Sequence, residues 1–188
     1  MTIYGWSPDS SKLYFYYSFY YDSGAPTLGY VRDLQTFDIH TGRVENTLPI
    51  PSESPTAFSF SADMNKIAFI DGDYVSILNL VTRSKRSIKI LTDQFNDAGW
   101  VSLSPSEKWL IYHTDKYEVG VFAIVVNLQT MKQEVFWKGY DLICYTFDGW
   151  TDDENPRYVG TDCNEHNVIF IDLKTHSQMI VGTVTPEP

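Results

Sequence analysis

The chain has 188 residues, with 24 Asp and Glu against 14 Lys and Arg, and a formal net charge of −10 at pH 7. Hydrophobic residues make up 43% of it and aromatic residues 15%, which is enough for a buried core and excludes a disordered chain. The acidic balance argues against binding to a phosphate backbone, and the apolar runs are too short and too interrupted by charge to span a bilayer. Residues 1–4 have neither the basic nor the apolar region of a signal peptide, so we expect none there.

The first element from the N-terminus is a strand that ends at Trp6 and leads into a turn. Ser7-Pro8-Asp9 is typical of a type I turn, because proline presets φ and the Ser and Asp side chains can satisfy backbone amides. An apolar strand at 13–16 follows. Copies of this first turn follow at residues 60–66, 103–108 and, in degraded form, 150–157. The first residues of successive copies are 54, 43 and 47 positions apart.

A second kind of turn begins at Asp38. In Asp38-Ile39-His40-Thr41 the leading carboxylate can accept a hydrogen bond from the amide two residues on, which makes an Asx-turn. Copies follow at spacings of 41, 48 and 45, at 79–82, 127–130 and 172–175. The two kinds of turn alternate in strict order along the chain. We therefore infer a repeat of about 45 residues.

Between the turns lie short runs rich in Val, Ile, Tyr and Phe, which predict four strands in each repeat. No window has the 3.6-residue period of a helix. Four-stranded antiparallel units at this period are typical of propeller blades, whereas a β-sandwich has no reason to repeat its turns. We expect an all-β protein, a β-propeller of four four-stranded antiparallel blades in one domain, 1–184. The predicted blades cover residues 3–50, 55–93, 97–139 and 142–184.

The turns also carry a family resemblance over nearly the whole chain. Trp6-Ser7-Pro8-Asp9 followed by Lys12-Leu13-Tyr14-Phe15 resembles the WD40-like, or PD40, repeat of TolB-type β-propellers. Asp38-Ile39-His40-Thr41-Gly42 is similar to the turn between the outer two strands of the same blades. The fourth copy departs from this pattern, with Asp152-Asp153-Glu154 in place of Ser-Pro-Asp. The resemblance implies an extracytoplasmic protein (periplasmic, secreted or at the cell surface) whose propeller binds proteins or small ligands, or gates a hydrolase domain.

The number of blades leaves the closure of the ring open. The predicted strands start with an innermost strand and end with an outermost one, so none is left over to join the first and last blades. Bare sheet edges invite pairing. Three alternatives remain: a partial ring from a longer parent chain with further blades, half of a larger ring formed by a homo-oligomer, or four blades that close alone. Residues 185–188 look like the start of a Pro-rich linker or tail.

Motifs for catalysis or for a cofactor are not found. The sequence has no Gly-x-Ser-x-Gly, His-Glu-x-x-His, P-loop or dinucleotide-binding pattern. Cys163 and His166 alone are too few to hold zinc. We expect a protein that is not an enzyme and has neither a cofactor nor a metal. Two acidic segments could attract calcium, which prefers oxygen ligands. The four histidines are scattered along the chain and indicate neither a catalytic nor a metal site. The segments are 71–73 and 152–154, and the histidines are His40, His113, His166 and His176.

Loop lengths single out a candidate recognition face. The first repeat carries an insertion of roughly ten residues between its second and third strands, and propeller geometry places this loop on the same rim as the connections between blades. Tyrosine gives a large rigid contact area, and carboxylates beside it favour a cationic peptide or a hydroxyl-rich ligand. Alternatively, the tyrosines only stack within a hairpin. The candidate residues are Tyr17, Tyr20, Tyr21, Asp22, Asp93, Asp97, Tyr140, Asp141, Asp162 and Glu165.

The function we expect is a non-catalytic module that binds a protein or peptide partner, with no nucleic acid and no membrane span. The alternatives are the propeller part of a larger hydrolase and a lectin-like propeller that binds carbohydrate or calcium.

The two cysteines suggest a disulfide. A fourth hairpin centred on residues 153–154 pairs positions whose numbers sum to about 307, which places Cys144 opposite Cys163. Two free thiols are the alternative, because a slip of one residue breaks the pairing.

Overall fold

The computed structural model describes most of the chain, in segments with gaps between them. No helix is found among the described residues, and hence none that is long and apolar enough to cross a membrane. The chain divides into two compact units, which are treated separately: unit 1 is Met1–Thr92 with Gly99–Val101, and unit 2 is Asp93–Ala98 with Ser102–Pro188. The described residues are 2–19, 30–48, 58–91, 97–116, 120–139, 145–151, 154–160, 167–172, 175 and 178–183.

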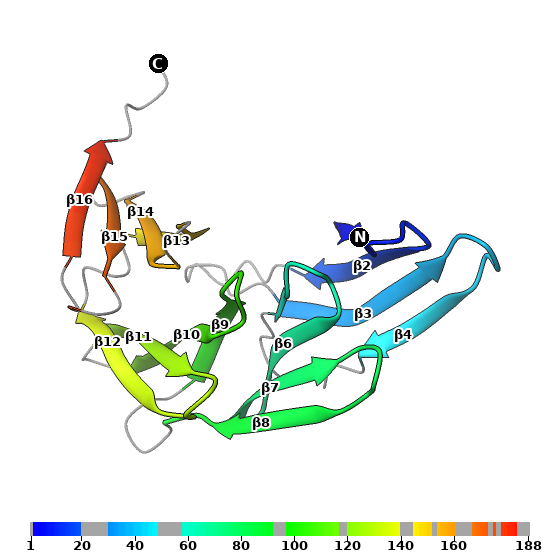
Figure 1. Ribbon diagram of the computed structural model, residues 1–188, viewed down its shortest axis with the longest axis horizontal. Helices are drawn as coiled ribbons and strands as arrows, with labels where there is room; N and C mark the ends of the chain where they lie inside the picture. The colour runs from blue at the N-terminus through cyan, green and yellow to red at the C-terminus, as the bar shows by residue number, and fades with distance from the viewer. Residues whose placement is uncertain are drawn as a thin grey trace. The chain divides into compact units, whose positions relative to one another are not determined.

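The described strands form four antiparallel sheets, each with four strands in chain order (Figure 1). Sheet 1 contains β1 (Thr2–Trp6), β2 (Lys12–Phe19), β3 (Tyr30–Asp38) and β4 (Val44–Leu48). Sheet 2 contains β5 (Phe58–Phe60), β6 (Lys66–Asp71), β7 (Tyr74–Asn79) and β8 (Lys85–Lys89). Sheet 3 contains β9 (Asp97–Leu103), β10 (Trp109–Lys116), β11 (Gly120–Asn127) and β12 (Gln133–Gly139). Sheet 4 contains β13 (Tyr145–Trp150), β14 (Pro156–Gly160), β15 (Asn167–Ile171) and β16 (Gln178–Thr183).

The first turn joins the first two strands of every sheet, as the sequence predicts. In sheet 1 the Ser7 hydroxyl donates a hydrogen bond to Asp9 at 2.6 Å and accepts one from the Lys12 amide at 2.9 Å. In sheet 2 the Ser61 hydroxyl makes the same two bonds, to Asp63 at 2.6 Å and from the Lys66 amide at 2.9 Å. Hydrogen bonds from the Ser7 and Ser11 hydroxyls lower the pKa of Asp9 to about 2. The Ser and Asp of this turn therefore satisfy amides that the strands leave unpaired.

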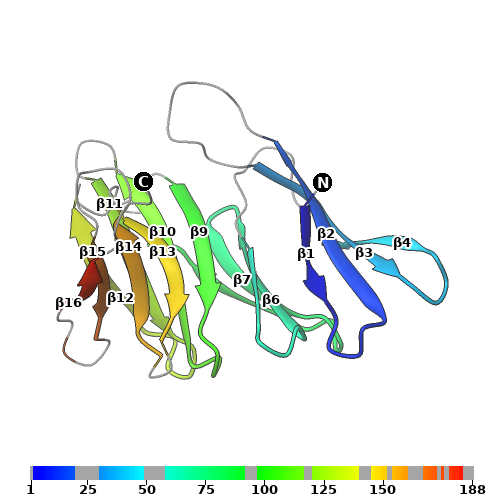
Figure 2. The same cartoon turned by 90° about the horizontal axis from the view of Figure 1, so that it is seen from above.

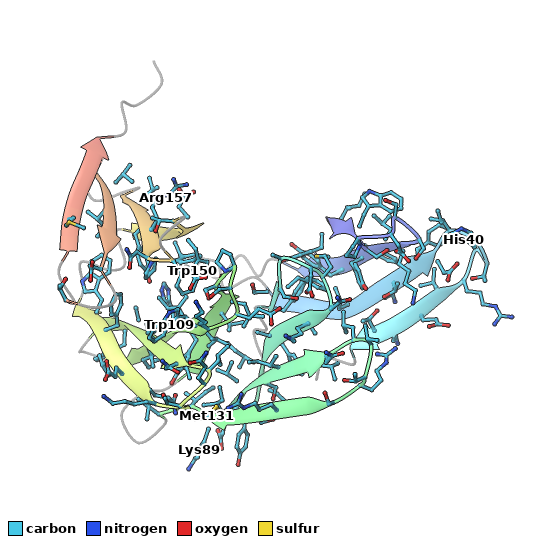
Figure 3. All side chains as sticks on the ribbon, in the orientation of Figure 1. His40, Lys89, Trp109, Met131, Trp150 and Arg157 are labelled. Carbon is cyan, nitrogen blue, oxygen red and sulfur yellow. The ribbon has the colours of Figure 1, made fainter. Side chains whose placement is uncertain are left out.

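The second turn joins the last two strands of each sheet and is an Asx-turn, again as predicted. Asp38 accepts hydrogen bonds from the amides of His40 and Thr41, both at 2.9 Å. Asn79 and Asn127 accept the equivalent pairs of amides over 2.8 to 3.0 Å. In Figure 3, His40 lies at the tip of the β3–β4 hairpin of sheet 1.

The fifth residue of the second turn has a left-handed backbone. Its φ is +67° at Gly42, +61° at Arg83 and +64° at Met131. A left-handed conformation costs a residue with a Cβ about 1–2 kcal/mol, whereas glycine adopts it freely. Sheet 1 thus has the residue that its turn favours, and sheets 2 and 3 do not.

This difference predicts stability changes of opposite sign. Gly42→Ala is expected to lower the free energy of unfolding by about 1 kcal/mol, and Arg83→Gly to raise it by up to about 1 kcal/mol after the added entropy of the unfolded chain. A Cβ at Gly42 meets no atom within 4 Å, so the effect comes from the backbone alone. Urea unfolding of the two variants beside the parent protein measures both changes, and changes of the same sign would contradict this explanation.

Aromatic rings hold sheets 1 and 2 together within unit 1. The Tyr4 ring lies 4.5 Å from the Phe60 ring between centroids, and its hydroxyl accepts the Phe60 amide at 3.2 Å. Tyr14 lies 4.9 Å from Phe60, and Tyr16 lies 5.2 Å from Phe58. A cluster of buried side chains continues this contact, made up of Tyr14, Leu34, Phe60, Ile67 and Phe69.

Sheets 3 and 4 pack in the same order within unit 2. Trp150 of sheet 4 donates its indole N–H to the Ser102 hydroxyl of sheet 3 at 3.0 Å. Tyr158 of sheet 4 stacks on His113 of sheet 3, with the rings 5.7 Å apart and 9° from parallel. We call the face that meets the preceding sheet the front face, and it carries Phe60 in sheet 2 and Tyr158 in sheet 4. The opposite face, which carries Tyr14 in sheet 1 and His113 in sheet 3, is the back face.

Burial on both faces explains the continuous apolar run of β11. Phe122 to Val126 are all buried, although successive side chains point to opposite faces of the sheet. On the back face, Ala123 lies with His113, because their backbones pair. These side chains of β11 are therefore buried on both faces of sheet 3.

Candidate recognition face and its surroundings

Each sheet has a turn end and a loop end. The turn end carries both repeated turns, and the loop end is where the second strand ends and the third begins. Figure 2 shows the turns that join β1 to β2 and β9 to β10 at the lower ends of their strands. The predicted recognition residues were assigned to loops of the opposite, loop end.

Two of the predicted residues fall within described strands, and both lie toward a loop end. Tyr17 lies in β2, with its backbone paired to that of Arg32, two positions before the strand ends. Asp97 is the first residue of β9. The side chains of Tyr17 and Asp97 lie outside the described part of the structure. The other predicted residues lie outside it altogether, and these are Tyr20, Tyr21, Asp22, Asp93, Tyr140, Asp141, Asp162 and Glu165. Their assembly into one face therefore stays a prediction.

The predicted insertion lies where the sequence placed it. In sheet 1, β2 and β3 pair up to Phe19 and Tyr30, which leaves residues 20–29 between the strands. In sheet 2 the last pair is Asp71 with Tyr74, and only Gly72 and Asp73 lie between them. Sheet 1 therefore has the longer connection at its loop end.

The short connection of sheet 2 exposes a pair of residues that are not among the predicted recognition residues. Tyr74 is 45% exposed, and Asp73 beside it is exposed as well. Gly72 has a φ of +57°, so it supplies the left-handed residue of the turn. A tyrosine next to a carboxylate at a loop end is the composition predicted for the recognition face.

The two acidic segments considered for calcium are involved in other contacts. Asp71 in β6 forms an ion pair with Lys85 in β8, the outer strand of the same sheet. Glu154 accepts the backbone amide of Ser106 at 2.9 Å and so joins two first turns of unit 2. Asp152 and Asp153 lie outside the described residues. Across the described ranges, no three His, Cys, Asp or Glu side chains come together as a metal site would require.

The register of the fourth hairpin differs from the one assumed for the disulfide. Trp150 pairs with Pro156 next to the turn, so the residue numbers of a pair sum to 306 at this point. A β-bulge between Phe147 and Gly149 then changes the sum, and Tyr145 pairs with Gly160. The register is thus one residue away from the expected sum of about 307 next to the turn, and the bulge shifts it by one more, because a bulge adds a residue to one strand only. Cys144 and Cys163 themselves lie outside the described residues, and their disulfide stays a prediction.

One histidine has a defined environment that the sequence did not indicate. His113 Nε2 lies 2.9 Å from the Tyr158 hydroxyl, in addition to the ring stacking. Burial lowers the pKa of His113 to about 4 and raises the pKa of Tyr158. Both groups are therefore neutral at pH 7, and their hydrogen bond joins sheets 3 and 4.

A small pocket lies on the back face of sheet 3, among the outer strands of unit 2. Its volume is about 160 Å³, well below the roughly 300–1,000 Å³ of sites for drug-sized ligands. Lys132 and Glu134 in its wall form an ion pair with each other, and the Asn127 side-chain oxygen caps the second turn. Lys132, Glu134 and Asn127 in the pocket wall thus already have polar partners. Its other lining residues are Trp109, Val125, Thr130 and Phe136.

Solved β-propeller structures share this fold. TolB from Acinetobacter baumannii has 16% sequence identity and a TM-score of 0.56, over 92% of this chain and 41% of that one. Oligogalacturonate lyase in complex with manganese has 13% identity and a TM-score of 0.64, over 96% of this chain and 51% of that one. A prolyl endopeptidase has 14% identity and a TM-score of 0.60, over 100% of this chain and 29% of that one.

At these identities the likeness establishes the fold and nothing finer. The chain is an all-β protein of the TolB-type propeller fold, with four four-stranded antiparallel blades that correspond to sheets 1–4. It spans about half or less of the length of the three structures. In sequence it matches no protein-family model and none of the curated proteins. Membership of the PD40 repeat family therefore stays a prediction from the turn motifs.

Proposed function

We propose that the protein is a non-catalytic propeller module that binds a protein or peptide through the Tyr- and Asp-rich loop ends of its sheets. The observation that carries the proposal is the exposed pair Asp73 and Tyr74 at the loop end of sheet 2. It has the composition predicted for the neighbouring loops, and the connection after Phe19 is longer than those of the other sheets. Tyrosine side chains contribute much contact area for little lost entropy, which is why recognition surfaces are rich in them.

The charge of the face determines the kind of partner. Carboxylates beside tyrosines attract a cationic segment, and a chain with a net charge of −10 steers such partners toward it. We propose a partner peptide rich in Lys or Arg. We also propose an extracytoplasmic location, on the strength of the resemblance to TolB-type propellers.

Alanine substitution of the loop tyrosines tests this function. In unit 1, Tyr74→Ala is expected to weaken the capture of Lys- and Arg-rich peptides from an array about tenfold, which corresponds to a loss of about 1.4 kcal/mol for a tyrosine that carries part of the binding energy. The triple variant Tyr20→Ala, Tyr21→Ala, Tyr140→Ala is expected to abolish capture while the melting temperature stays nearly unchanged.

His40→Ala is the matched control, because His40 is exposed at a turn end. It should bind as the parent protein does. Unchanged peptide binding in the triple variant would contradict the proposed face, and a large fall in its melting temperature would favour the purely structural alternative, in which the tyrosines stack within a hairpin.

A second candidate function is the propeller part of a larger hydrolase. The observation in its favour is the match of the whole chain to 29% of a prolyl endopeptidase. Reading the genomic open reading frame on both sides of these 188 residues for a Gly-x-Ser-x-Gly segment discriminates between the two, because that motif marks a serine nucleophile. Its presence would favour the hydrolase.

A further inference from the structure

The outer strand of sheet 2 is strongly basic in a chain that is acidic as a whole. Residues 83–89, which include all of β8, hold four of the 14 Lys and Arg of the chain and no acid. The outer strands of the other sheets differ: β4 contains one Glu and no cation, β12 contains one Glu and one Lys, and β16 contains no charge. The basic cluster is therefore particular to sheet 2 and is not a property of the repeat. Its members are Arg83, Lys85, Arg86 and Lys89.

The four cations are all exposed, and they lie on both faces of the strand. Lys85 lies on the front face, with its Nζ 5.5 Å from the centre of the Phe69 ring. Arg86 is the next residue along β8 and so lies on the back face. Among the described residues, neither Arg83 nor Arg86 forms an ion pair. The charges of these two arginines are therefore available to a partner.

The backbone of β8 offers hydrogen-bonding groups along its outer edge as well. β8 is the last strand of its sheet, and no described strand pairs with its outer side (Figure 1). The Asn79 amide donates to the Ser84 carbonyl at 2.9 Å, just before β8 begins. In an antiparallel pair, residues bonded to the neighbouring strand alternate with residues whose amide and carbonyl point away from it. The register therefore directs the backbone groups of Lys85 and Ser87 outward.

An edge of this kind suits an extended acidic peptide. A peptide that adds a strand to a sheet edge gains backbone hydrogen bonds, and the side chains that flank it select its sequence. Lys85 and Arg86 flank the edge of β8 on opposite faces, so they complement a strand with acidic side chains on both of its faces. The same cations repel the β8 edge of another copy of the chain, which disfavours pairing between two copies.

We propose that sheet 2 binds an acidic peptide segment of a partner protein, which adds to the outer edge of β8 as a further strand. The Asp and Glu side chains of this segment lie beside Lys85 and Arg86, and its backbone pairs with that of Lys85 and Ser87. The site is independent of the proposed function, because it lies along a strand edge and not at a loop end, and because it attracts the opposite charge.

Fluorescence anisotropy of a labelled peptide, in which Glu-Glu-Val is repeated three times, tests the site at low ionic strength, where attraction between charges is little screened. The parent protein is expected to bind this peptide. Arg86→Glu is expected to weaken the binding at least about tenfold, because a repulsive charge replaces an attractive one. Lys89→Glu serves as a second variant if Arg86→Glu does not fold. Lys108→Glu is the matched control, since Lys108 is exposed in a first turn and its substitution changes the net charge equally.

Amide hydrogen exchange, measured by NMR with and without the peptide, distinguishes strand pairing from attraction between charges alone. In the free protein the outward amides of Lys85 and Ser87 are expected to exchange faster than the amide of Arg86, which the register directs toward β7. Saturating peptide is expected to slow exchange at Lys85 and Ser87 at least about tenfold, because both amides then donate to the added strand.

Three outcomes would overturn the proposal. A parent protein that does not bind the acidic peptide at low ionic strength has cations that only keep sheet edges apart. Equal weakening by Arg86→Glu and Lys108→Glu would mean that the peptide responds to net charge and not to β8. Binding without slower exchange at Lys85 and Ser87 would mean that the cluster attracts any polyanion, such as a sulfated polysaccharide, and pairs with no strand.

Discussion

Tyr158→Ala is expected to lower the free energy of unfolding of unit 2 by about 3 to 5 kcal/mol, the usual cost of removing a buried aromatic side chain. Tyr158 is 0% exposed. Its ring contacts Trp137 at 5.2 Å, Phe147 at 5.5 Å and His113 at 5.7 Å between centroids. The alanine variant removes these contacts and also the hydroxyl that pairs with His113 Nε2.

Two further variants separate the contributions of the ring and of the hydroxyl to this loss of unfolding free energy. Tyr158→Phe keeps the ring and removes only the hydroxyl, so it is expected to cost about 1–3 kcal/mol, the penalty for a buried polar group that loses its partner. Tyr74→Ala is the control for tyrosine removal as such, because Tyr74 is 45% exposed. Urea unfolding followed by near-ultraviolet circular dichroism measures all three. An alanine variant at Tyr158 that costs no more than the one at Tyr74 would show that Tyr158 does not lie between two sheets.

The stability of the protein is expected to fall as the pH is lowered from about 6.5 to about 4. The pKa of His113 is lowered to about 4 by burial, against 6.5 for an ordinary histidine. Within this range the unfolded chain takes up a proton at His113 that the folded protein does not, so acid favours unfolding. Since each pKa unit corresponds to about 1.36 kcal/mol, the loss is on the order of 3 kcal/mol, and above pH 6.5 it is absent.

His113→Gln isolates this contribution from that of the carboxylates. The pKa of Asp9, Asp38 and Asp63 is lowered by hydrogen bonds within their turns, so these groups also destabilise the protein in acid, but mainly below pH 4. Unfolding free energies at pH 7, 6 and 5 should therefore decline in the parent protein and stay nearly level in the variant. Equal slopes would mean that His113 is accessible to protons in the folded state.

The repeated turns could be predicted from the sequence because their chemistry is local. Ser7 and Asp9 lie two residues apart and bond each other, and Asp38 caps amides of its own turn. Such contacts depend on a few neighbouring residues and not on the rest of the fold. Two turns that alternate along the chain then imply four strands per repeat, which the described sheets confirm.

The contacts between sheets could not be predicted, because they depend on register. The β-bulges at Ile3–Gly5 and Phe147–Gly149 change which residues share a face, and no composition signal indicates them. Nothing in the sequence around His113 indicates a partner 45 residues away. The same reason applies to one face of sheet 1: Trp6 and Val44 are 38 positions apart, and only the register of three strand pairs brings them to one face.

The candidate recognition face is a prediction from loop lengths, and Tyr74 is proposed as a further member of it. The described strands place the connection after Phe19 and residue Asp97 at loop ends, and the recognition role of both stays a prediction. Tyr74 was not selected from the sequence, because Asp71-Gly72-Asp73 is a sufficient explanation of a hairpin. Its exposure could only be seen once the strand register was known.

Within each unit, the front face of one sheet packs on the back face of the sheet before it, and this packing is the central claim about the fold. Aromatic proton contacts between Tyr158 and His113, measured by nuclear Overhauser effects in a sample labelled at Tyr and His, test it most directly. Propeller packing predicts strong contacts between these two rings and between the Tyr158 and Trp137 rings. A folded protein in which Tyr158 shows contacts to residues of its own sheet but none to His113 or Trp137 would contradict it.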